Sequence, residues 1–300
     1  MSDDVSTRHA RTVERAPLPT DPNLCPPIEP DFAVALDAAL RSIGIELRPG
    51  VRAGIEAHVR LLLAWNAAIN LTAIRMPAAI ALDHVADALT AISIVRAMGI
   101  VKRPALLDLG SGAGYPGLPL ALALPARRVT LVDSVAKKAR FLQVAGAAAV
   151  SVVEHGGEPA PQLEVLAQRA EVLAYDRRHR GRQDLVTARA VGSLTELVEL
   201  GLPFLRRGGR LVAWKRAGVD QTLPADHSPH RRPGAVERPT LADELADAER
   251  LLSVLGGVLE GVEAVRVPGL EDHRLVVVRA DHPTPTAYPR SPAERRRDRR

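Results

Sequence analysis

The stretch LLDLGSGAGYPG, residues 106–117, decides the fold. The apolar run 105–107 predicts a buried strand, three glycines at alternate positions predict a tight turn, and the apolar segment 118–124 predicts the helix that follows. Glycine suits such a turn because the backbone adopts positive φ and because a ligand must come close to the main chain. We therefore interpret this stretch as a cofactor-binding turn between a strand and a helix.

A second unit follows the turn. Residues 128–133 form another apolar run that ends in an acid, Asp133, which lies 23 residues after Gly110. In a doubly wound sheet, an acid at this place accepts hydrogen bonds from the hydroxyl groups of a ribose. The alternative interpretation of Asp133 is an acid that caps the following helix.

Asp108 bears on the kind of cofactor. It precedes the first glycine by two residues, where its carboxylate would repel a pyrophosphate. S-adenosylmethionine (SAM) tolerates that acid, because it has a sulfonium and an α-amino group and no phosphate. We therefore expect SAM as the cofactor, with a dinucleotide and a purely structural turn as the alternatives.

Composition narrows the class of protein. The chain has 300 residues, of which 46% are hydrophobic, so a sizeable core is expected. No apolar run reaches the roughly 18 residues of a membrane helix, and the N-terminus lacks the apolar region of a secretory signal. The single cysteine, Cys25, cannot form an internal disulfide, which suits the cytoplasm. A net charge of +5 favours an anionic partner, nucleic acid first, although a solvated basic surface explains it equally.

The chain divides into segments of different composition. Residues 1–30 are charged and then proline-rich, which predicts a disordered leader. Residues 31–99 contain three helical patterns and predict an N-terminal helical cap. Residues 100–282 are expected to form the main domain, with a flexible insertion at 217–239. Residues 283–300 are expected to form a basic C-terminal tail, in which 290–300 is disordered. The strands expected in the main domain are 105–107, 128–133, 150–153, 184–187, 210–215, 262–267 and 275–279.

This alternation of strands and helices predicts an α/β fold with a Rossmann-like, doubly wound, mainly parallel seven-stranded sheet. The last two strands are joined without room for a crossover helix, so the final strand should run antiparallel. Ligands of such sheets lie outside the carboxyl ends of the first and fourth strands. The residues expected at that edge are Asp108, Gly110, Asp133 and Arg189.

Further motifs complete a recognisable set: WNAAINLT at 65–72, DHVADA at 83–88, LVDS at 131–134 with KKARFL at 137–142, RAE at 169–171, TARA at 187–190, Lys215, and DHRLVVV at 272–278. Together with the glycine turn they resemble the RsmG (GidB) family of bacterial small-subunit rRNA methyltransferases, over about 65–289. The resemblance implies the fold of a SAM-dependent methyltransferase. It also implies methyl transfer to N7 of a guanine that corresponds to guanine 527 of 16S rRNA.

The resemblance implies roles for individual residues. Arg189, His84 and Asp87 are the expected catalytic group. His84 and Asp87 would face the cofactor turn or the guanine, or would form a structural hydrogen-bonded pair. Arg189 would bind the SAM carboxylate, hold a phosphate of the target nucleotide or anchor a helix, and the resemblance favours the first. The expected cofactor-binding residues are Asp108, Gly110, Gly112, Tyr115, Asp133, Ala170, Glu171 and Arg189.

The expected partner is 16S rRNA, alone, in the small ribosomal subunit or in an assembly intermediate, and the protein is expected to be a monomer without membrane contact. Asp83 stands where the family has arginine and Ala88 where it has serine, so we expect a divergent member. Glu158 is a rival to Glu171 for the adenine-binding place. No histidine has the partners or spacing of a metal ligand. The alternative functions are a nicotinamide oxidoreductase, a SAM-fold protein that binds nucleic acid without catalysis, and a methyltransferase of another RNA.

Overall fold

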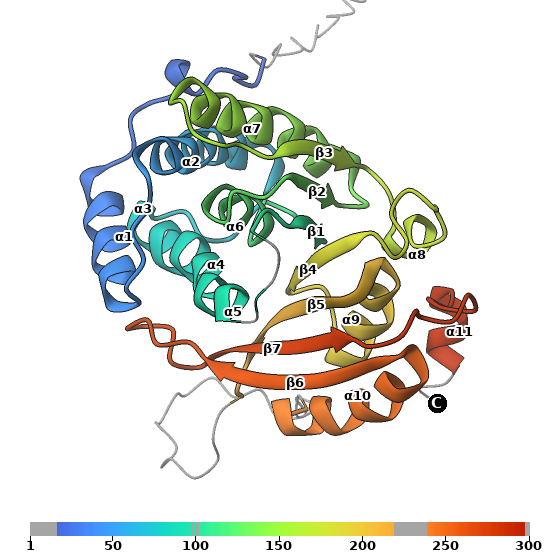
Figure 1. The fold of residues 1–300 in the computed structure, drawn as a ribbon. Coiled ribbons are helices and arrows are strands. Elements are labelled where there is room, and N and C mark those ends of the chain that lie inside the picture. The colour runs from blue at the N-terminus through green and yellow to red at the C-terminus, as the bar shows by residue number, and fades with distance from the viewer. Residues whose placement is uncertain (1–16, 98, 100–101, 219–238, 298–300) are drawn as a thin grey trace, which may run out of the picture.

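The computed structural model describes residues 17–97, 99, 102–218 and 239–297. A seven-stranded sheet in the order β3-β2-β1-β4-β5-β7-β6 crosses the molecule (Figure 1). The first five strands in this order pair in parallel, and β7 is antiparallel to both of its neighbours. The predicted doubly wound sheet and its antiparallel last strand are therefore confirmed. The strands are β1 Ala105–Leu109, β2 Arg128–Val132, β3 Gln162–Leu166, β4 Gln183–Arg189, β5 Leu205–Arg216, β6 Gly257–Ala264 and β7 His273–Ala280.

One predicted strand is wrong. Residues 150–153 belong to the helix α7 (Ala136–His155), and β3 lies in the segment that was expected to be irregular. In α7 the buried residues Ala145, Ala149 and Val153 recur every four residues, which is the spacing of one helix face. The short valine run at its end therefore continues the helix, because it packs on that face.

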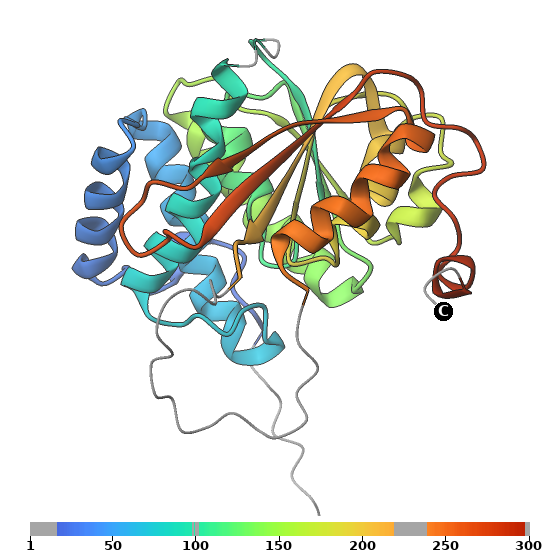
Figure 2. The ribbon, with the colours of Figure 1, turned by 90° about the horizontal axis from the view of Figure 1, so that it is seen from below.

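Helices cover both faces of the sheet (Figures 1 and 2). Side chains alternate along β1, so that Leu106 joins the core under one helix layer and Leu107 joins the core under the other. One layer contains α6 (Gly117–Ala123), α7 and the N-terminal cap. The other layer contains α8 Ala170–Leu173, α9 Leu194–Gly201, the 3-10 helix η3 Leu202–Phe204 and α10 Leu241–Leu255.

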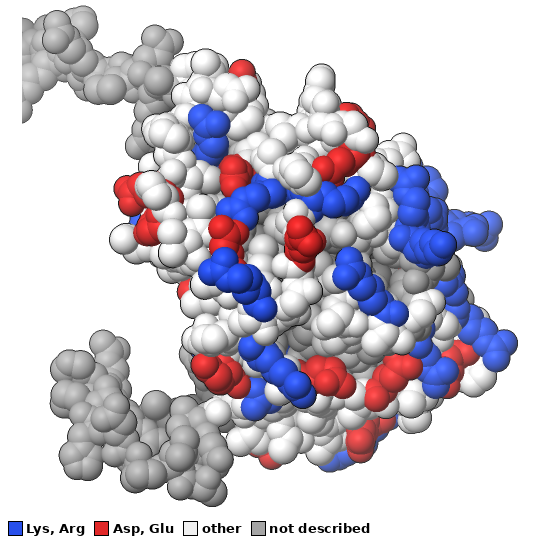
Figure 3. Space-filling model, turned by 60° about the vertical axis from the view of Figure 1, so that its left-hand side comes forward, with Lys and Arg blue, Asp and Glu red and all other residues white. Residues whose placement is uncertain are grey.

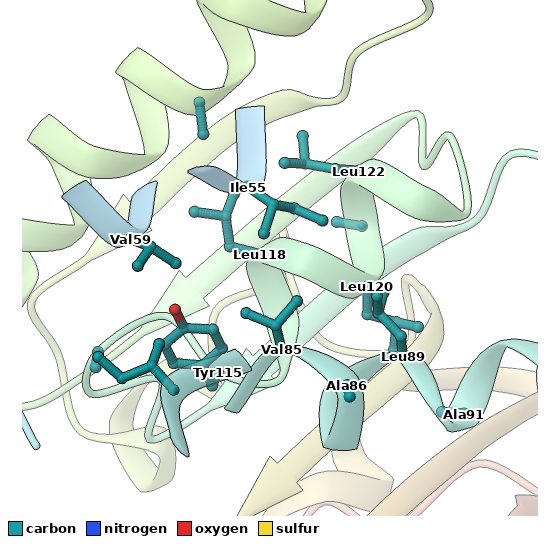
Figure 4. Packing of buried hydrophobic residues seen from close by; sticks show 14 of the residues in the cluster. Ile55, Val59, Val85, Ala86, Leu89, Ala91, Tyr115, Leu118, Leu120 and Leu122 are labelled. Atoms are coloured by element: carbon teal, nitrogen blue, oxygen red, sulfur yellow. The ribbon is translucent and has the colours of Figure 1, made fainter. Parts of the chain in front are cut away.

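The N-terminal cap contains three helical segments, as predicted, and the first helix of each segment begins at a proline. The third helical segment, Pro77–Ala97, includes one π-helical stretch, η2, immediately before Asp87. Figure 4 shows Val85 of η2 packed near Ile55 of α2 and Leu118 of α6. The cap elements are α1 Pro30–Ser42, α2 Pro49–Ile69, α3 Pro77–Ala79, η2 Ile80–Ala86, α4 Asp87–Leu89 and α5 Ala91–Ala97.

The path Pro77–Ala97 also bears on membrane contact. Within the described part of the chain, it alone is long and apolar enough to cross a membrane. Of its most apolar window, 67% is buried inside the fold, as in the core helix of a globular domain.

Part of the expected disordered leader is ordered. Residues 17–30 include the short helix η1 (Pro22–Leu24), and Cys25 is buried. The indole Nε1 of Trp65 donates to the carbonyl of Pro19 at 2.7 Å. The leader is therefore held by hydrogen bonds to its backbone, which its polar composition did not reveal. Residues 1–16 and 219–238, the latter within the expected insertion, lie outside the described residues.

Candidate active site

The glycine turn lies at the carboxyl end of β1, at the centre of the sheet. Gly110 and Gly112 have φ of +64° and +55°, which side chains disfavour. A Cβ atom at Gly110 would also lie 2.7 Å from Cγ2 of Val191, in the loop after β4. Because Gly110 is exposed, the main chain of the turn is accessible at this edge, as the approach of a ligand requires.

Asp133 ties the turn to β2. Its Oδ2 accepts a hydrogen bond from the backbone N–H of Gly112 at 3.0 Å, and its Oδ1 accepts one from Val135 at 2.8 Å. The second bond holds the segment just before α7, so the capping interpretation describes part of what Asp133 does. A carboxylate offers about four acceptor positions, so both oxygens keep capacity for the hydroxyl groups of a ribose.

Asp108 supports the glycine turn from the interior of the fold. Its side chain is fully buried, and its Oδ1 accepts a hydrogen bond from the hydroxyl of Thr187 in β4 at 2.6 Å. A Cβ atom at Gly117 would overlap the side chain of Asp108, so α6 begins directly on it. Burial raises the pKa of Asp108 to about 6. In this structure Asp108 is enclosed and braces β1 against β4, and its place among the cofactor-binding residues stays a prediction.

Tyr115 is also enclosed. Its ring stacks on His84 at 4.7 Å between centroids and lies 4.8 Å from the ring of His58 in α2. His58 Nε2 donates to the carbonyl of Ala113 at 2.7 Å, and burial lowers its pKa to about 4. Tyr115 thus fixes the cap to the turn through its ring, and its side chain is buried rather than open to a cofactor. Sequence reasoning missed His58; a polar residue on the apolar face of its helix was the available signal.

Arg189, at the end of β4, reaches into the cap. Its Nη1 donates to Oδ2 of Asp87 at 2.8 Å and to the carbonyl of Asp83 at 2.7 Å. Its Nη2 lies 2.9 Å from Nδ1 of His84. The structure therefore brings together all three predicted catalytic residues. We call the group Thr72, His84, Asp87, Arg189 and His273 the clasp.

The bonds of His84 define its protonation state. Since a guanidinium can only donate, Nδ1 of His84 accepts from Arg189, and the proton of the neutral ring lies on Nε2. That Nε2–H donates to the hydroxyl of Thr72 at 2.8 Å. Burial and then the charge of Arg189 lower the pKa of His84 to about 3. At neutral pH His84 is thus a neutral connector between Arg189 and the segment after α2.

Asp87 is the centre of the clasp. Its side chain is fully buried, and its Oδ1 lies 2.8 Å from Nδ1 of His273 in β7. The indole of Trp214 in β5 donates to its carbonyl at 3.0 Å. One carboxyl group therefore joins the cap to β4 and β7. His84 and Asp87 do not bond to each other; they share Arg189.

The predicted adenine-binding segment begins α8, just after β3. Glu171 forms an ion pair with Arg295 near the C-terminus, and its side chain is 16% exposed. Its rival Glu158 accepts a hydrogen bond from the backbone of Gly50 at 2.7 Å, on the way into β3, and so lies away from the carboxyl edge. The position of Ala170 and Glu171 at the carboxyl edge fits the prediction, whereas that of Glu158 does not. Among the described residues no group of side chains could hold a metal ion.

The doubly wound sheet with its antiparallel seventh strand, the glycine turn after β1 and the acid after β2 define the class of SAM-dependent methyltransferases. A family model described as rRNA small subunit methyltransferase G (GidB) matches residues 52–228. The chain belongs to this family, whose activity is SAM-dependent methylation of 16S rRNA.

Relatives within the family match most of the chain. Ribosomal RNA small subunit methyltransferase G of Roseiflexus castenholzii is 40% identical over 78% of this chain and 86% of that protein. The enzyme of the same name from Symbiobacterium thermophilum is 35% identical over 85% of this chain and 92% of that protein. That of Chloroflexus aggregans is 38% identical over 83% and 90%. The predicted family, fold class and cofactor are therefore confirmed.

Proposed function

We propose that this protein methylates N7 of the guanine corresponding to guanine 527 of 16S rRNA, with SAM bound at the carboxyl edge of β1 and β2. The observation that carries the proposal is that the glycine turn, Asp133 and Arg189 meet at one edge of the sheet in a chain of this family. The substrate is small-subunit rRNA in the cytoplasm, where ribosomes are assembled, and the protein acts as a monomer.

The residues at this edge fit SAM. The main chain at Gly110 is exposed where the methionine part would come close, and Asp133 has acceptor capacity for the ribose hydroxyl groups. When bound, SAM supplies the methyl group of its sulfonium. Gly110 and Asp133 would hold the methionine part and the ribose of SAM at this edge.

The chemistry needs positioning more than proton transfer. Guanine N7 carries a lone pair and no proton, so its attack on a methyl group requires no general base. His84 would be a poor base in any case, because its Nδ1 is bonded to Arg189 and its pKa is near 3. Alignment of two reactants can lower a barrier by roughly 7–11 kcal/mol. We assign the alignment of guanine and SAM to the carboxyl edge of the sheet, which the clasp holds rigid. Arg189, His84 and Asp87 are therefore positioning residues.

The proposed role of Asp133 in binding the ribose of SAM can be tested with the full chain. Asp133→Ala should weaken SAM binding by about 1.5–3 kcal/mol, because it removes charge-assisted hydrogen bonds to the ribose. Calorimetry with SAM measures the loss, and urea unfolding of the same variant without SAM separates it from damage to the turn. Affinity equal to that of wild type in a folded Asp133→Ala protein would contradict the ribose role.

The target itself is tested in cells. A strain without this protein should lose one 7-methylguanosine from its 16S rRNA, and the wild-type chain should restore it. Mass mapping of the modified nucleotides identifies the position. A deletion strain that keeps its full complement of 7-methylguanosine would refute the proposal. SAM binding without methylation of any RNA would favour a SAM-fold protein that only binds nucleic acid.

A further inference from the structure

The C-terminal segment crosses the molecule from one edge of the sheet to the other. Because β7 is antiparallel to β5, its last residues pair with the start of β5, at the amino edge of the parallel strands. The chain then continues to α11 (Pro292–Arg297), which lies beside α8 in Figure 1. We call residues 283–297 the strap. The tail predicted to be disordered, 290–300, is therefore ordered over 290–297.

The strap is anchored along its length by arginines. The guanidinium of Arg180, just before β4, donates to the carbonyls of Thr284 and Tyr288, each at 2.9 Å. Farther along, Arg290 donates from its backbone N–H to Oε1 of Glu199 at 2.7 Å and from Nη2 to Oε2 at 2.7 Å. Glu199 lies in α9 and is 1% exposed. The strap thus runs back along α9 toward the carboxyl edge.

The last anchor places α11 at the candidate active site. Arg295 forms an ion pair with Glu171 of α8, and its Nη2 lies 3.7 Å from Glu196 in the first turn of α9. Both helices begin just after a parallel strand ends, α8 after β3 and α9 after β4. A helix fastened to both starts therefore stands at the edge where the cofactor and the guanine must meet.

The next two residues of α11 differ from Arg295. Arg296 and Arg297 are exposed, and within the described part of the chain neither makes a hydrogen bond or ion pair. Glu294 lies close enough for Arg297 to lower its pKa, but its carboxylate accepts hydrogen bonds from the backbone and hydroxyl of Ser291. On the face in Figure 3, basic and acidic side chains are interspersed over the left and lower parts, and basic side chains also gather at the right-hand edge. The two arginines, which form no ion pair among the described residues, thus add positive charge at the site's margin.

We propose that the strap presents Arg296 and Arg297 to phosphates of the rRNA that flank the target guanine. This inference rests on the proposed function and adds a substrate-contact surface to it. A guanidinium suits a phosphate because its planar N–H groups match two phosphate oxygens. Arg295 serves as the tether, so that the two free arginines meet the RNA at a fixed distance from the reacting base.

The test uses the full chain with Arg296→Gln and Arg297→Gln together. Each lost phosphate contact should reduce the slope of log affinity against log salt by about 0.7 for single-stranded RNA, so the expected reduction is about 1.4. The probe is 16S rRNA that lacks the modification. KM for this RNA should rise, whereas kcat at saturating RNA and the affinity for SAM should stay at wild-type values.

The matched control is the double variant Arg103→Gln and Arg207→Gln. Both are exposed arginines at the amino edge, Arg103 just before β1 and Arg207 near the start of β5, and their loss changes the net charge equally. The control should keep the wild-type slope and KM. An unchanged slope in the strap variant, or an equal reduction in the control, would overturn the inference. A wild-type protein that methylates no 16S rRNA would instead refute the proposed function.

Discussion

The two ends of the chain fasten to the same edge of the sheet by different means. The N-terminal cap uses the clasp, in which Asp87 is fully buried and His84 is 7% exposed. The C-terminal strap uses a row of separate anchors, such as Arg290, whose side chain is 25% exposed although its partner Glu199 is 1% exposed. Four elements converge on the clasp, whereas each anchor of the strap joins it to one or two helices or loops.

This difference in anchoring predicts how each region responds when one of its carboxylates loses its partner. A buried carboxylate that loses its partner stays buried and uncompensated, which is costly. A carboxylate under a strap can be hydrated when the strap lifts, so the damage stays local. The clasp therefore suits the carboxyl edge, where the reacting groups must be held fixed. The strap suits a surface that meets a large, variable partner such as the rRNA.

The largest effect should follow the loss of Asp87. Asp87→Ala leaves Arg189 without its buried carboxylate and should lower the free energy of unfolding by about 3–5 kcal/mol. Urea unfolding measures the change. The control is Asp176→Ala, which breaks an exposed pair with Arg178 and should remain near wild type. A midpoint for Asp87→Ala equal to that of the control would mean that the clasp contributes little.

Much of the clasp could be predicted because its residues lie in short motifs. The motifs around His84, Asp87 and Arg189 singled out all three residues, and in the structure Arg189 contacts the other two; their catalytic role stays a prediction. The partners of the guanidinium could not be predicted, because they depend on how the cap docks on the sheet. Asp87 precedes Arg189 by 102 residues in the chain. Local sequence contains no signal for a contact at that separation.

The strap was missed for a related reason. Residues 283–297 are rich in proline and arginine, a composition typical of disorder. Order comes from Arg180 and Glu199, which lie about a hundred residues earlier and whose contacts arise only once the sheet has formed. The false strand at 150–153 has another cause, since a short apolar run fits a helix and a strand equally well.

A smaller effect is expected from the strap. Arg290→Ala removes charge-assisted hydrogen bonds to Glu199 and should lower stability by roughly 1.5–3 kcal/mol. Amide hydrogen exchange should quicken across residues 283–297 and stay slow in β1. Arg250→Ala, which removes an exposed arginine of α10, is the matched control. If exchange quickened equally in β1 and in the strap, the strap would be part of the global folding unit.

Mild acid should distinguish the two regions, because only the clasp depends on a neutral histidine. Burial lowers the pKa of His84 to about 3 and that of His58 to about 4, from an ordinary value of 6.5. Below pH 6.5 the unfolded chain therefore binds more protons than the folded one, and stability falls as the pH falls. Asp108 acts in the opposite direction, since its raised pKa of about 6 makes the folded state bind the extra proton.

His84→Gln should make stability less sensitive to acid. Between pH 6.5 and 5.5, wild type should lose about 1 kcal/mol more than the variant, because one fewer buried imidazole must remain uncharged. Urea unfolding at the two pH values measures the difference, and His155→Gln, an exposed histidine at the end of α7, is the control. The strap contains no histidine, so its hydrogen exchange, corrected for the intrinsic effect of pH, should not change. Equal acid sensitivity in wild type and His84→Gln would contradict a lowered pKa for His84 and the hydrogen bond that its Nδ1 accepts from Arg189.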